Sequence, residues 1–366
     1  MRRRGVRSCL RRGALAIVLM LVLAAPGFGA QKRPVSMITK VIQVGQSKVL
    51  VNIVEADLKD KRLRIEVALA DDIVGAMEEL SSLAARKDAA AAINGTYFDS
   101  YSDGPVWNPV GTIITGGRMV HKGGTGTLIG FGEGNSVFME AARFKIVGAT
   151  DGSYNYPLNW YAHHLNRAST ARDSAVLYTS EWGRAVGGDG GTTVVASGGR
   201  VTMITEATVK VSKDGFALHL KGSEKSLLSR FKVGSAVEWK VVGAAGDPLE
   251  GFWGGVREAI GAGPRLVWDG KASFNISSAI GEGFTEAKIL SQSLARSAVG
   301  VTKDGRLLMV TTGALKMHEL AALMLTLGSY NAMSLDGADS SGLWFDGEYV
   351  TKPGREIPNA ILVYEQ

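Results

Sequence analysis

The pattern of apolar and polar positions along the chain predicts a protein built mostly from short strands. Seven segments show period-two alternation or a short β-branched run, as strands do. They are residues 48–54, 62–68, 192–196, 207–211, 236–242, 306–311 and 360–364. Glycine is frequent, with 47 of 366 residues, and lies between these segments without a collagen-like period. This arrangement is typical of tight turns between strands.

Two segments carry apolar residues at helical spacing. Residues 76–86 have Glu78 and Glu79 early and Arg86 late, an order that the helix dipole favours. Residues 316–327 place leucine and methionine on one side and stop at Gly328. The chain therefore predicts an α+β fold, β-rich, with mixed sheets and a few helices, and shows no long linker or internal repeat.

The first thirty residues are predicted to be a signal peptide. Six arginines precede an apolar stretch at residues 14–25, which is too short to span a bilayer comfortably. We expect cleavage near Ala30 and export to the periplasm or the extracellular space. Arg11-Arg12 leaves the twin-arginine route open beside general secretion, and an uncleaved anchor is the alternative.

The signal segment changes how the charge is interpreted. The whole chain has 41 basic and 35 acidic residues, but the first thirty residues contain six of the arginines and no acid. The mature chain would be neutral, so no nucleic-acid partner is expected. The only cysteine, Cys9, also lies in this segment, so no disulfide, thiol nucleophile or cysteine metal site is expected after cleavage. No membrane span is predicted in the mature chain.

The segment from Ser334 to Gly342 places two carboxylates and two hydroxyls on one glycine-rich turn. Asp336 and Asp339 are three residues apart, and Ser340 and Ser341 follow. Apolar stretches at residues 330–335 and 343–345 flank this turn, and strand ends are suited to presenting polar groups. The serines lack the glycine spacing of an esterase elbow, so we expect them to donate hydrogen bonds to a sugar or phosphate, or to cap the turn.

Two other segments present polar groups beside predicted strands. Asn94 precedes Gly95, Tyr97 and Phe98, and Asp99 follows as a second polar site group or a loop cap. Arg296 begins a strand, where its guanidinium could bind a phosphate in two places or could be a surface cation.

Residues 160–167 are dense in aromatic and polar side chains. Trp160, Tyr161 and His163 suggest a wall that stacks on a sugar. Adjacent histidines without a spaced third ligand argue against zinc, so no metal site is predicted here. No cofactor is expected, although the sequence leaves a divalent metal open. His219 lies in an alternating segment, and we expect it to be exposed.

Taken together, these motifs resemble the phosphodiester glycosidase family. The family pattern is matched by Asn94 to Phe98, then Gly263 to Val267, Arg296 to Gly300 with Asp304-Gly305, Glu319 to Ala321, Leu335 to Ser341, and finally Arg355, Pro358 and Asn359-Ala360. The likeness runs from about residue 62 to the C-terminus. The chain departs from the family at Gly337-Ala338-Asp339, where the family has three glycines, and at Thr312, where it has an aspartate.

The resemblance implies an exported hydrolase that cleaves a sugar from a glycosyl phosphodiester at the anomeric carbon, with a sugar-phosphate or glycan of the envelope, or a glycoconjugate, as substrate. It implies catalytic roles for Asp336, with Asp339 or Asp99, and substrate binding by Asn94, Arg296, Asn166 and Arg167. From their own chemistry, Ser340, Ser341 and His163 are also expected to bind the substrate. The alternatives are a non-catalytic carbohydrate-binding or envelope-assembly protein on the same fold, and a phosphodiesterase that cleaves at phosphorus. The predicted organisation is a signal peptide (1–30), an N-terminal β segment (31–60) and a phosphodiester glycosidase-like domain (61–366).

Overall fold

The segments that carry the predicted site residues Asn94, Arg296 and Asp336 lie where two antiparallel sheets meet. The computed structural model describes residues 33–45, 47–101, 104–124, 126–243 and 255–366. The predicted signal peptide, its cleavage point and Cys9 lie outside the described residues. Within residues 34–366, the described part forms one compact unit.

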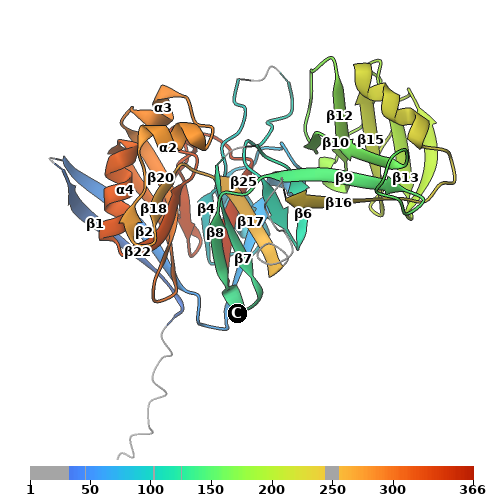
Figure 1. The fold of residues 1–366 in the computed structure, drawn as a ribbon. Helices are drawn as coiled ribbons and strands as arrows, with labels where there is room; N and C mark the ends of the chain where they lie inside the picture. The colour runs from blue at the N-terminus through green and yellow to red at the C-terminus, as the bar shows by residue number, and fades with distance from the viewer. Residues whose placement is uncertain (1–32, 46, 102–103, 125, 244–254) are drawn as a thin grey trace, which may run out of the picture. The chain divides into compact units, whose positions relative to one another are not determined.

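A seven-stranded antiparallel sheet forms one side of the site (Figure 1). Its strands, in spatial order, are β1 (Val35–Val44), β2 (Ser47–Asp57), β21 (Arg306–Leu315), β20 (Leu294–Thr302), β22 (Ser329–Ser334), β18 (Arg265–Trp268) and β19 (Lys271–Ala272). The predicted N-terminal segment is thus a hairpin whose second strand pairs with β21. The predicted domain division at residue 61 stays a prediction.

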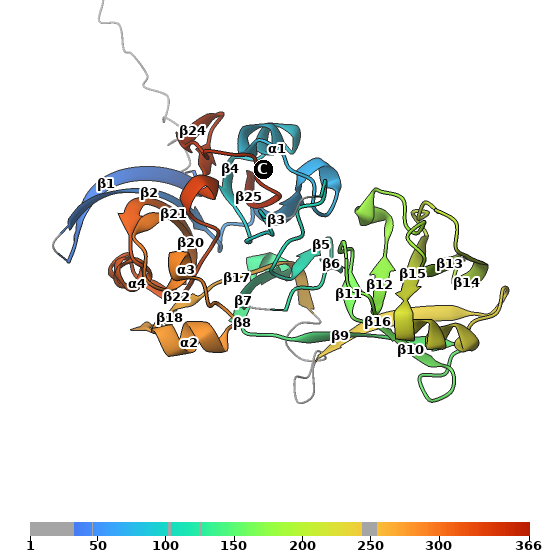
Figure 2. The same cartoon turned by 90° about the horizontal axis from the view of Figure 1, so that it is seen from above.

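Helices cover one face of this sheet. α4 (Met317–Thr326) contacts β18 and β22 through its buried apolar side, and Figures 1 and 2 show α2 (Ile276–Gly281) and α3 (Ala287–Leu290) nearby. α4 ends before Gly328, whose φ of 86° suits a helix C-terminus. The predicted helix at 316–327 is confirmed. The other predicted helix is shorter than expected, because α1 (Leu80–Arg86) begins only after Glu78 has paired with Ile357 in a β-bridge.

A second antiparallel sheet supplies the other side of the site. Its order is β24 (Glu348–Thr351), β23 (Leu343–Phe345), β4 (Ala91–Asn94), β25 (Asn359–Glu365) and β3 (Leu63–Leu69). A third sheet consists of β6 (Arg118–His121), β5 (Ile113–Thr115), β17 (Val256–Ala262), β7 (Thr127–Gly132) and β8 (Val137–Glu140). One continuous apolar core joins the three sheets, with Val51, Ile93, Ile113, Val299 and Leu320 among its members.

Residues 144–243 form two further sheets around a separate apolar core that contains Trp160 and Leu218. One sheet consists of β10 (Asn159–Ala162), β9 (Phe144–Thr150) and β16 (Val237–Gly243). The other consists of β11 (His164–Leu165), β12 (Ser174–Tyr178), β15 (Gly215–Lys221), β13 (Thr192–Ser197) and β14 (Arg200–Thr205). Short 3-10 helices complete the fold: η1 (Ala70–Asp72), η2 (Glu133–Asn135), η3 (Ser180–Trp182), η4 (Gly222–Arg230) and η6 (Ala338–Ser340).

The predicted β-rich α+β class is confirmed. Six of the seven predicted strands form, and the one at residues 207–211 is wrong. This segment makes a single bridge from Val209 to Val186. The facing chain then enters Gly187, Gly188 and Gly190, whose positive φ values cannot continue a strand ladder.

Candidate functional site

Asn94 joins β4 to β20 and to the loop between β22 and β23 at the candidate site. At the end of β4, its Nδ2 donates to the Asp336 carbonyl at 2.7 Å. Its Oδ1 accepts from Ser297 Oγ at 2.8 Å and from the Gly342 amide at 3.0 Å. Asn94 is 1% exposed, so all three bonds are shielded from water. The structure therefore uses this predicted ligand to position the loop that follows β22.

Asp336 is the second residue of that loop, after Leu335, and is 8% exposed. Its amide donates to the Gly95 carbonyl at 3.0 Å, which fixes the loop against the second sheet. Its Oδ1 accepts from the Gly337 amide at 3.0 Å, and its Oδ2 lies 3.8 Å from Arg355 Nη2. Burial raises the pKa of Asp336 to about 6, against the opposing effects of Ser340, Arg355, the Gly337 amide and Lys288. A carboxyl group with this pKa can change its proton state near neutral pH, as catalytic carboxyls do.

Asp336 lines a pocket of about 110 Å³. Aromatic side chains form part of its wall, and charged groups converge on it from three separate segments. The lining residues are Tyr97, Phe98, Ser100, Val110, Gly283, Phe284, Thr285, Glu286, Lys288, Ile289, Asp336 and Arg355. This pocket combines a buried carboxyl with two cations and a second carboxyl.

Arg355 and Lys288 are the cations of this pocket, and neither was predicted as a site residue. Arg355 lies with its guanidinium carbon 4.7 Å from the Phe98 ring centre and donates from Nε to Ser340 Oγ at 2.9 Å. Lys288 Nζ lies 2.8 Å from Glu286 Oε2. Burial lowers the pKa of Lys288, but Glu286 and, less strongly, Tyr101 and Asp336 raise it above its usual value. Arg355 stands in a segment that carries the family resemblance, so the sequence held a signal for it. Nothing in the local sequence marks Glu286 or Lys288.

The other residues of the 336–341 loop differ in their environments. Ser340 is buried and holds Arg355, so it acts on the pocket through that side chain. Ser341 is 3% exposed, and its Oγ has no hydrogen-bond partner among the described residues. Asp339 is exposed and does not line the pocket. Ala338 has a φ of 53°, the left-handed conformation that glycine adopts most easily, which explains a glycine at this place in the family pattern.

Asp99 and Arg296 lie close to the pocket in sequence or space without lining it. Asp99 is exposed, and its Oδ1 accepts from the Tyr101 amide at 3.3 Å, as a loop cap does. Arg296 is 3% exposed and donates from Nε to the Leu315 carbonyl at 2.9 Å. Its Nη2 donates to the carbonyls of Lys288 and Gln292 at 3.0 and 2.6 Å.

These bonds give Arg296 a role in holding α3 and its following turn. Burial lowers the pKa of Arg296. Thr312, where the family pattern has an aspartate, is its neighbour in the β20–β21 register and supplies no charge. Only Nη1 makes no hydrogen bond with a described residue, so contact with an anion would have to go through this one group.

The remaining predicted residues lie in a different region of the molecule. Asn166 is fully buried, and its side chain bonds to the Val120 carbonyl and to Thr179. Arg167 is half-buried, and its carbonyl accepts from Tyr178. His163 is exposed, with Nε2 4.0 Å from Glu224. Trp160 does not contribute to the predicted sugar-stacking wall, because it is 1% exposed and stacks on Phe216 in the core.

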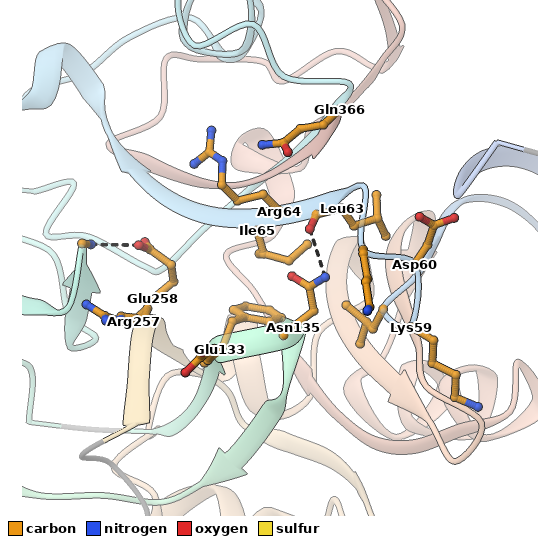
Figure 3. Close-up of a pocket in the computed structure, with 16 residues that line it drawn as sticks. Lys59, Asp60, Leu63, Arg64, Ile65, Glu133, Asn135, Arg257, Glu258 and Gln366 are labelled. Atoms are coloured by element: carbon orange, nitrogen blue, oxygen red, sulfur yellow. Dashed lines mark hydrogen bonds between the residues drawn. The ribbon is translucent and has the colours of Figure 1, made fainter.

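Two larger pockets contain none of the predicted site residues. One of them, of about 650 Å³, lies between β3, η2 and β17, and Figure 3 shows Arg64, Glu258 and Asn135 on its wall. Glu258 in this pocket accepts hydrogen bonds from the Val67 and Gly116 amides and thereby joins two sheets. A third pocket, of about 370 Å³, lies against Trp239 and Met119. The 650 Å³ pocket also holds a buried carboxyl with a raised pKa, Glu258, but backbone amides donate to both of its oxygens. We therefore place the candidate site at the small pocket, where Asp336 lies with Arg355 and Lys288.

No group of three or more histidine, cysteine, aspartate or glutamate residues in the described part of the chain is placed to hold a metal ion. None of the helices in the described ranges has the length and apolar content needed to cross a membrane.

The model of the phosphodiester glycosidase family matches residues 183–364. This region of the chain is a phosphodiester glycosidase family sequence. The predicted resemblance is confirmed, and the match includes Arg296, Asp336 and Arg355. It begins later than residue 62, so Asn94, Asp99 and residues 163–167 lie outside it. No protein of curated function matches the chain.

Three solved structures share the fold of this chain. A hypothetical protein from Synechocystis aligns with a TM-score of 0.78 and 20% identity over 91% of this chain and 62% of its own. A protein from Burkholderia pseudomallei, provisionally described as exported, aligns with a TM-score of 0.70 and 21% identity over 87% and 74%.

The third structure is the catalytic domain of zebrafish N-acetylglucosamine-1-phosphodiester alpha-N-acetylglucosaminidase, auto-inhibited by its pro-peptide. It aligns with a TM-score of 0.50 and 13% identity over 92% of this chain and 85% of that domain. At these identities the three structures establish the fold alone. The chain spans less than two thirds of the Synechocystis structure.

Proposed function

We propose that this protein is a glycosidase that hydrolyses a glycosyl phosphodiester at the anomeric carbon, with Asp336 as the principal carboxylate. The observation that carries the proposal is a buried carboxyl with a pKa of about 6, in a pocket that also presents Arg355 and Lys288. A pocket with both charges suits a substrate that develops positive charge on a sugar and releases a phosphate. The match to the phosphodiester glycosidase family supports the same reaction class.

The proposed reaction breaks the bond between the anomeric carbon and the phosphate oxygen and forms a bond between that carbon and a water oxygen. Asp336, ionised above about pH 6, stabilises the positive anomeric carbon and accepts the proton of the water. The products are a free sugar and a phosphate monoester. A phosphate monoester has a second pKa of about 6 and leaves easily, so protonation by a general acid matters less than in ordinary glycosidases.

Arg355 and Lys288 hold the negative charge of the departing phosphate in this proposal. Each is placed by an acceptor beside the pocket, Ser340 for Arg355 and Glu286 for Lys288. The partner carboxylate is Glu286, since it lines the pocket with Asp336. Glu286, Asp99 and Asp339 are all exposed, but Asp99 and Asp339 do not line the pocket, which makes them weaker candidates for this role.

We further propose that the enzyme is exported and acts on an envelope glycan phosphate or a glycoconjugate. The basic and apolar segments of residues 1–30 support export, and so does the description of the Burkholderia structure. The mass of the intact protein recovered from the extracytoplasmic fraction should correspond to a chain that begins near Gln31. Recovery of the full-length chain from the cytosol would contradict export.

Hydrolysis in oxygen-18 water tests the reaction directly. With a sugar-phosphate-sugar diester as substrate, the label should enter the sugar. Label in the phosphate would mean attack at phosphorus and would replace the glycosidase with a phosphodiesterase. Binding without turnover of several such diesters would instead favour a carbohydrate-binding protein on this fold.

Substitutions test the roles proposed for Asp336 and Arg355. Asp336→Asn keeps the shape of the side chain and removes its charge, so turnover should fall by about 10²–10⁴-fold. Arg355→Gln should lower kcat/KM by about 10–100-fold, as expected for a charge-assisted contact. In the wild type, kcat/KM should rise as the pH passes upward through about 6, because Asp336 then ionises. Glu348→Gln, which removes an exposed carboxyl on β24, is the matched control and should behave as wild type.

A further inference from the structure

A second concentration of positive charge lies outside the Asp336 pocket. His121 ends β6 and Lys122 follows it, while His164 begins β11 and Arg167 lies three residues later. Asn166 joins the two segments, since its Nδ2 donates to the Val120 carbonyl at 2.9 Å and its carbonyl lies 3.4 Å from His121 Nδ1. We call His121, Lys122, His164 and Arg167 the cationic cluster. None of its members lines the Asp336 pocket.

The cationic cluster is withdrawn from water without a counter-charge. His121 is fully buried, and the other three side chains are half-buried. None of the four forms an ion pair with a residue in the described ranges; the nearby carboxylate of Glu224 lies instead beside His163 and Tyr161. Lys122 and Arg167 are the charged members at neutral pH, because burial lowers the pKa values of His121 and His164 to about 4. Burying cations unpaired is costly, and an anion would relieve that cost.

The members of the cluster influence one another electrostatically. Burial, then Arg167 and Lys122, lower the pKa of His164 to about 4. Burial and Arg167 lower the pKa of Lys122. His121 Nε2 has no hydrogen-bond partner among the described residues, although buried polar groups are usually satisfied. Mutual repulsion and an unsatisfied donor or acceptor are what a bound oxyanion would correct.

We propose that the cationic cluster is a second oxyanion site, which binds a phosphate or phosphodiester group. The guanidinium of Arg167 and the ammonium of Lys122 supply charge and donors suited to phosphate. The bound group is either free phosphate or, if the proposed glycosidase function holds, a neighbouring phosphate of a substrate that carries several.

The position of the cluster relative to the catalytic pocket favours contact with one extended ligand. Asn108 exchanges two hydrogen bonds with Ala168, beside Arg167. Two residues further along the chain, Val110 donates to the Tyr97 carbonyl and lines the Asp336 pocket. The short segment 108–110 therefore connects the cluster to the pocket, and a substrate with more than one phosphate could reach both.

Calorimetry with inorganic phosphate at pH 7 tests the site without any turnover. Wild-type protein should bind phosphate, and Arg167→Gln or Lys122→Gln should weaken binding at least about tenfold. Arg172→Gln removes an exposed arginine nearby and should bind as wild type. In NMR titrations, phosphate should raise the pKa of His164, a response that a purely structural cluster would not give. Circular dichroism of each variant, with Arg167→Lys as the charge-conserving change, checks that the fold is kept.

Absence of phosphate binding to the wild type, or equal binding to Arg167→Gln, overturns the proposal. KM values of the wild type and of Arg167→Gln, measured for a one-phosphate diester and for an oligomer with several phosphates, show where the bound phosphate comes from. If Arg167→Gln raises KM for the oligomer only, the site binds a neighbouring phosphate of the substrate. If Arg167→Gln weakens binding of inorganic phosphate and leaves both KM values unchanged, the site binds free phosphate. If the wild type cleaves neither substrate, the glycosidase function fails, while calorimetry still decides the oxyanion site.

Discussion

Asn94 and Asn166 perform the same task in two regions of the molecule. Each is buried, each uses its amide in three hydrogen bonds, and each fixes a loop that presents charged side chains. The loop held by Asn94 presents a carboxylate, Asp336, with its cations beside it. The segments held by Asn166 present Lys122 and Arg167, while the nearby carboxylate of Glu181 is bound by Thr179 and paired with Arg118.

The two regions show that the residues that position a loop are not the residues that bind a ligand. In both regions the asparagine that resembles a ligand-binding residue forms its hydrogen bonds within the protein, and neighbouring charged side chains are the groups available to a substrate. A carboxylate beside cations suits bond cleavage, whereas cations alone suit holding an anion. We therefore expect the two regions to respond differently to equivalent substitutions.

The largest expected effect comes from removing the two asparagines. Asn94→Ala leaves the Asp336 carbonyl, Ser297 Oγ and the Gly342 amide without their buried partner and should lower the free energy of unfolding by about 3–5 kcal/mol. Asn166→Ala should cost a similar amount. Urea unfolding measures both, and Asn155→Ala, at an exposed turn position, should cost less than about 0.5 kcal/mol.

The functional consequences should differ between the two asparagine variants. Asn94→Ala should lose turnover more than phosphate affinity, and Asn166→Ala should lose phosphate affinity more than turnover. The same pattern in both variants would show that the two regions form a single site.

A smaller effect should appear in the pH dependence of stability. The folded protein keeps the proton of Asp336 up to about pH 6, above the value of about 3.9 for a free side chain. Stability from this group is therefore full below about pH 4 and is lost as the pH rises through about 6. Two pKa units correspond to about 2–3 kcal/mol.

Asp336→Asn removes this pH dependence. Relative to wild type, the variant should gain about 2–3 kcal/mol between pH 4 and pH 8 in denaturant unfolding. Asp339→Asn, which removes an exposed carboxyl of the same loop, is the comparison. A gain of equal size in Asp339→Asn would mean that general charge, rather than burial of Asp336, sets the effect.

The smallest effect concerns the backbone of the Asp336 loop. Because Ala338 has a φ of 53°, Ala338→Gly should raise the free energy of unfolding by about 0.5–1 kcal/mol. The same substitution at exposed Ala322 in α4 should lower it by about 1 kcal/mol. Thermal unfolding distinguishes these opposite signs, and destabilisation by Ala338→Gly would show that the loop gains nothing from a glycine.

Much of the fold could be predicted, since its strands and helices follow local patterns. Strands such as β3 and β25 carry alternating or continuous apolar residues, and α4 has one buried side.

The prediction that His219 is exposed is wrong, because the chain packs a glycine against it. A side chain on Gly191 would come within 2.3 Å of the His219 ring, so the absence of one lets the histidine lie buried between Thr193 and Asp189.

The candidate site could be predicted only in part. Asp336 follows from its place after a strand and from the family pattern. Glu286 and Lys288 could not be predicted, because they reach the pocket from a short helical segment some fifty residues before Asp336. Arg296 has the sequence context of a phosphate ligand, yet its N–H groups lie within reach of three carbonyls and bond to them.

The sequence by itself determined the strand-rich fold, the family and the carboxylate at the centre of the candidate site, because local periodicity and contiguous motifs are properties of neighbouring residues. The tertiary structure decided which polar side chains face inward and which face a ligand. This depends on packing between segments far apart in the chain: Asn94 meets Asp336 across 242 positions, and Asn166 meets Val120 across 46. An asparagine side chain at either place forms hydrogen bonds with buried backbone groups, and leaving such groups unpaired would be costly. The asparagines therefore stabilise the fold, while the charged side chains near them remain available to bind a ligand.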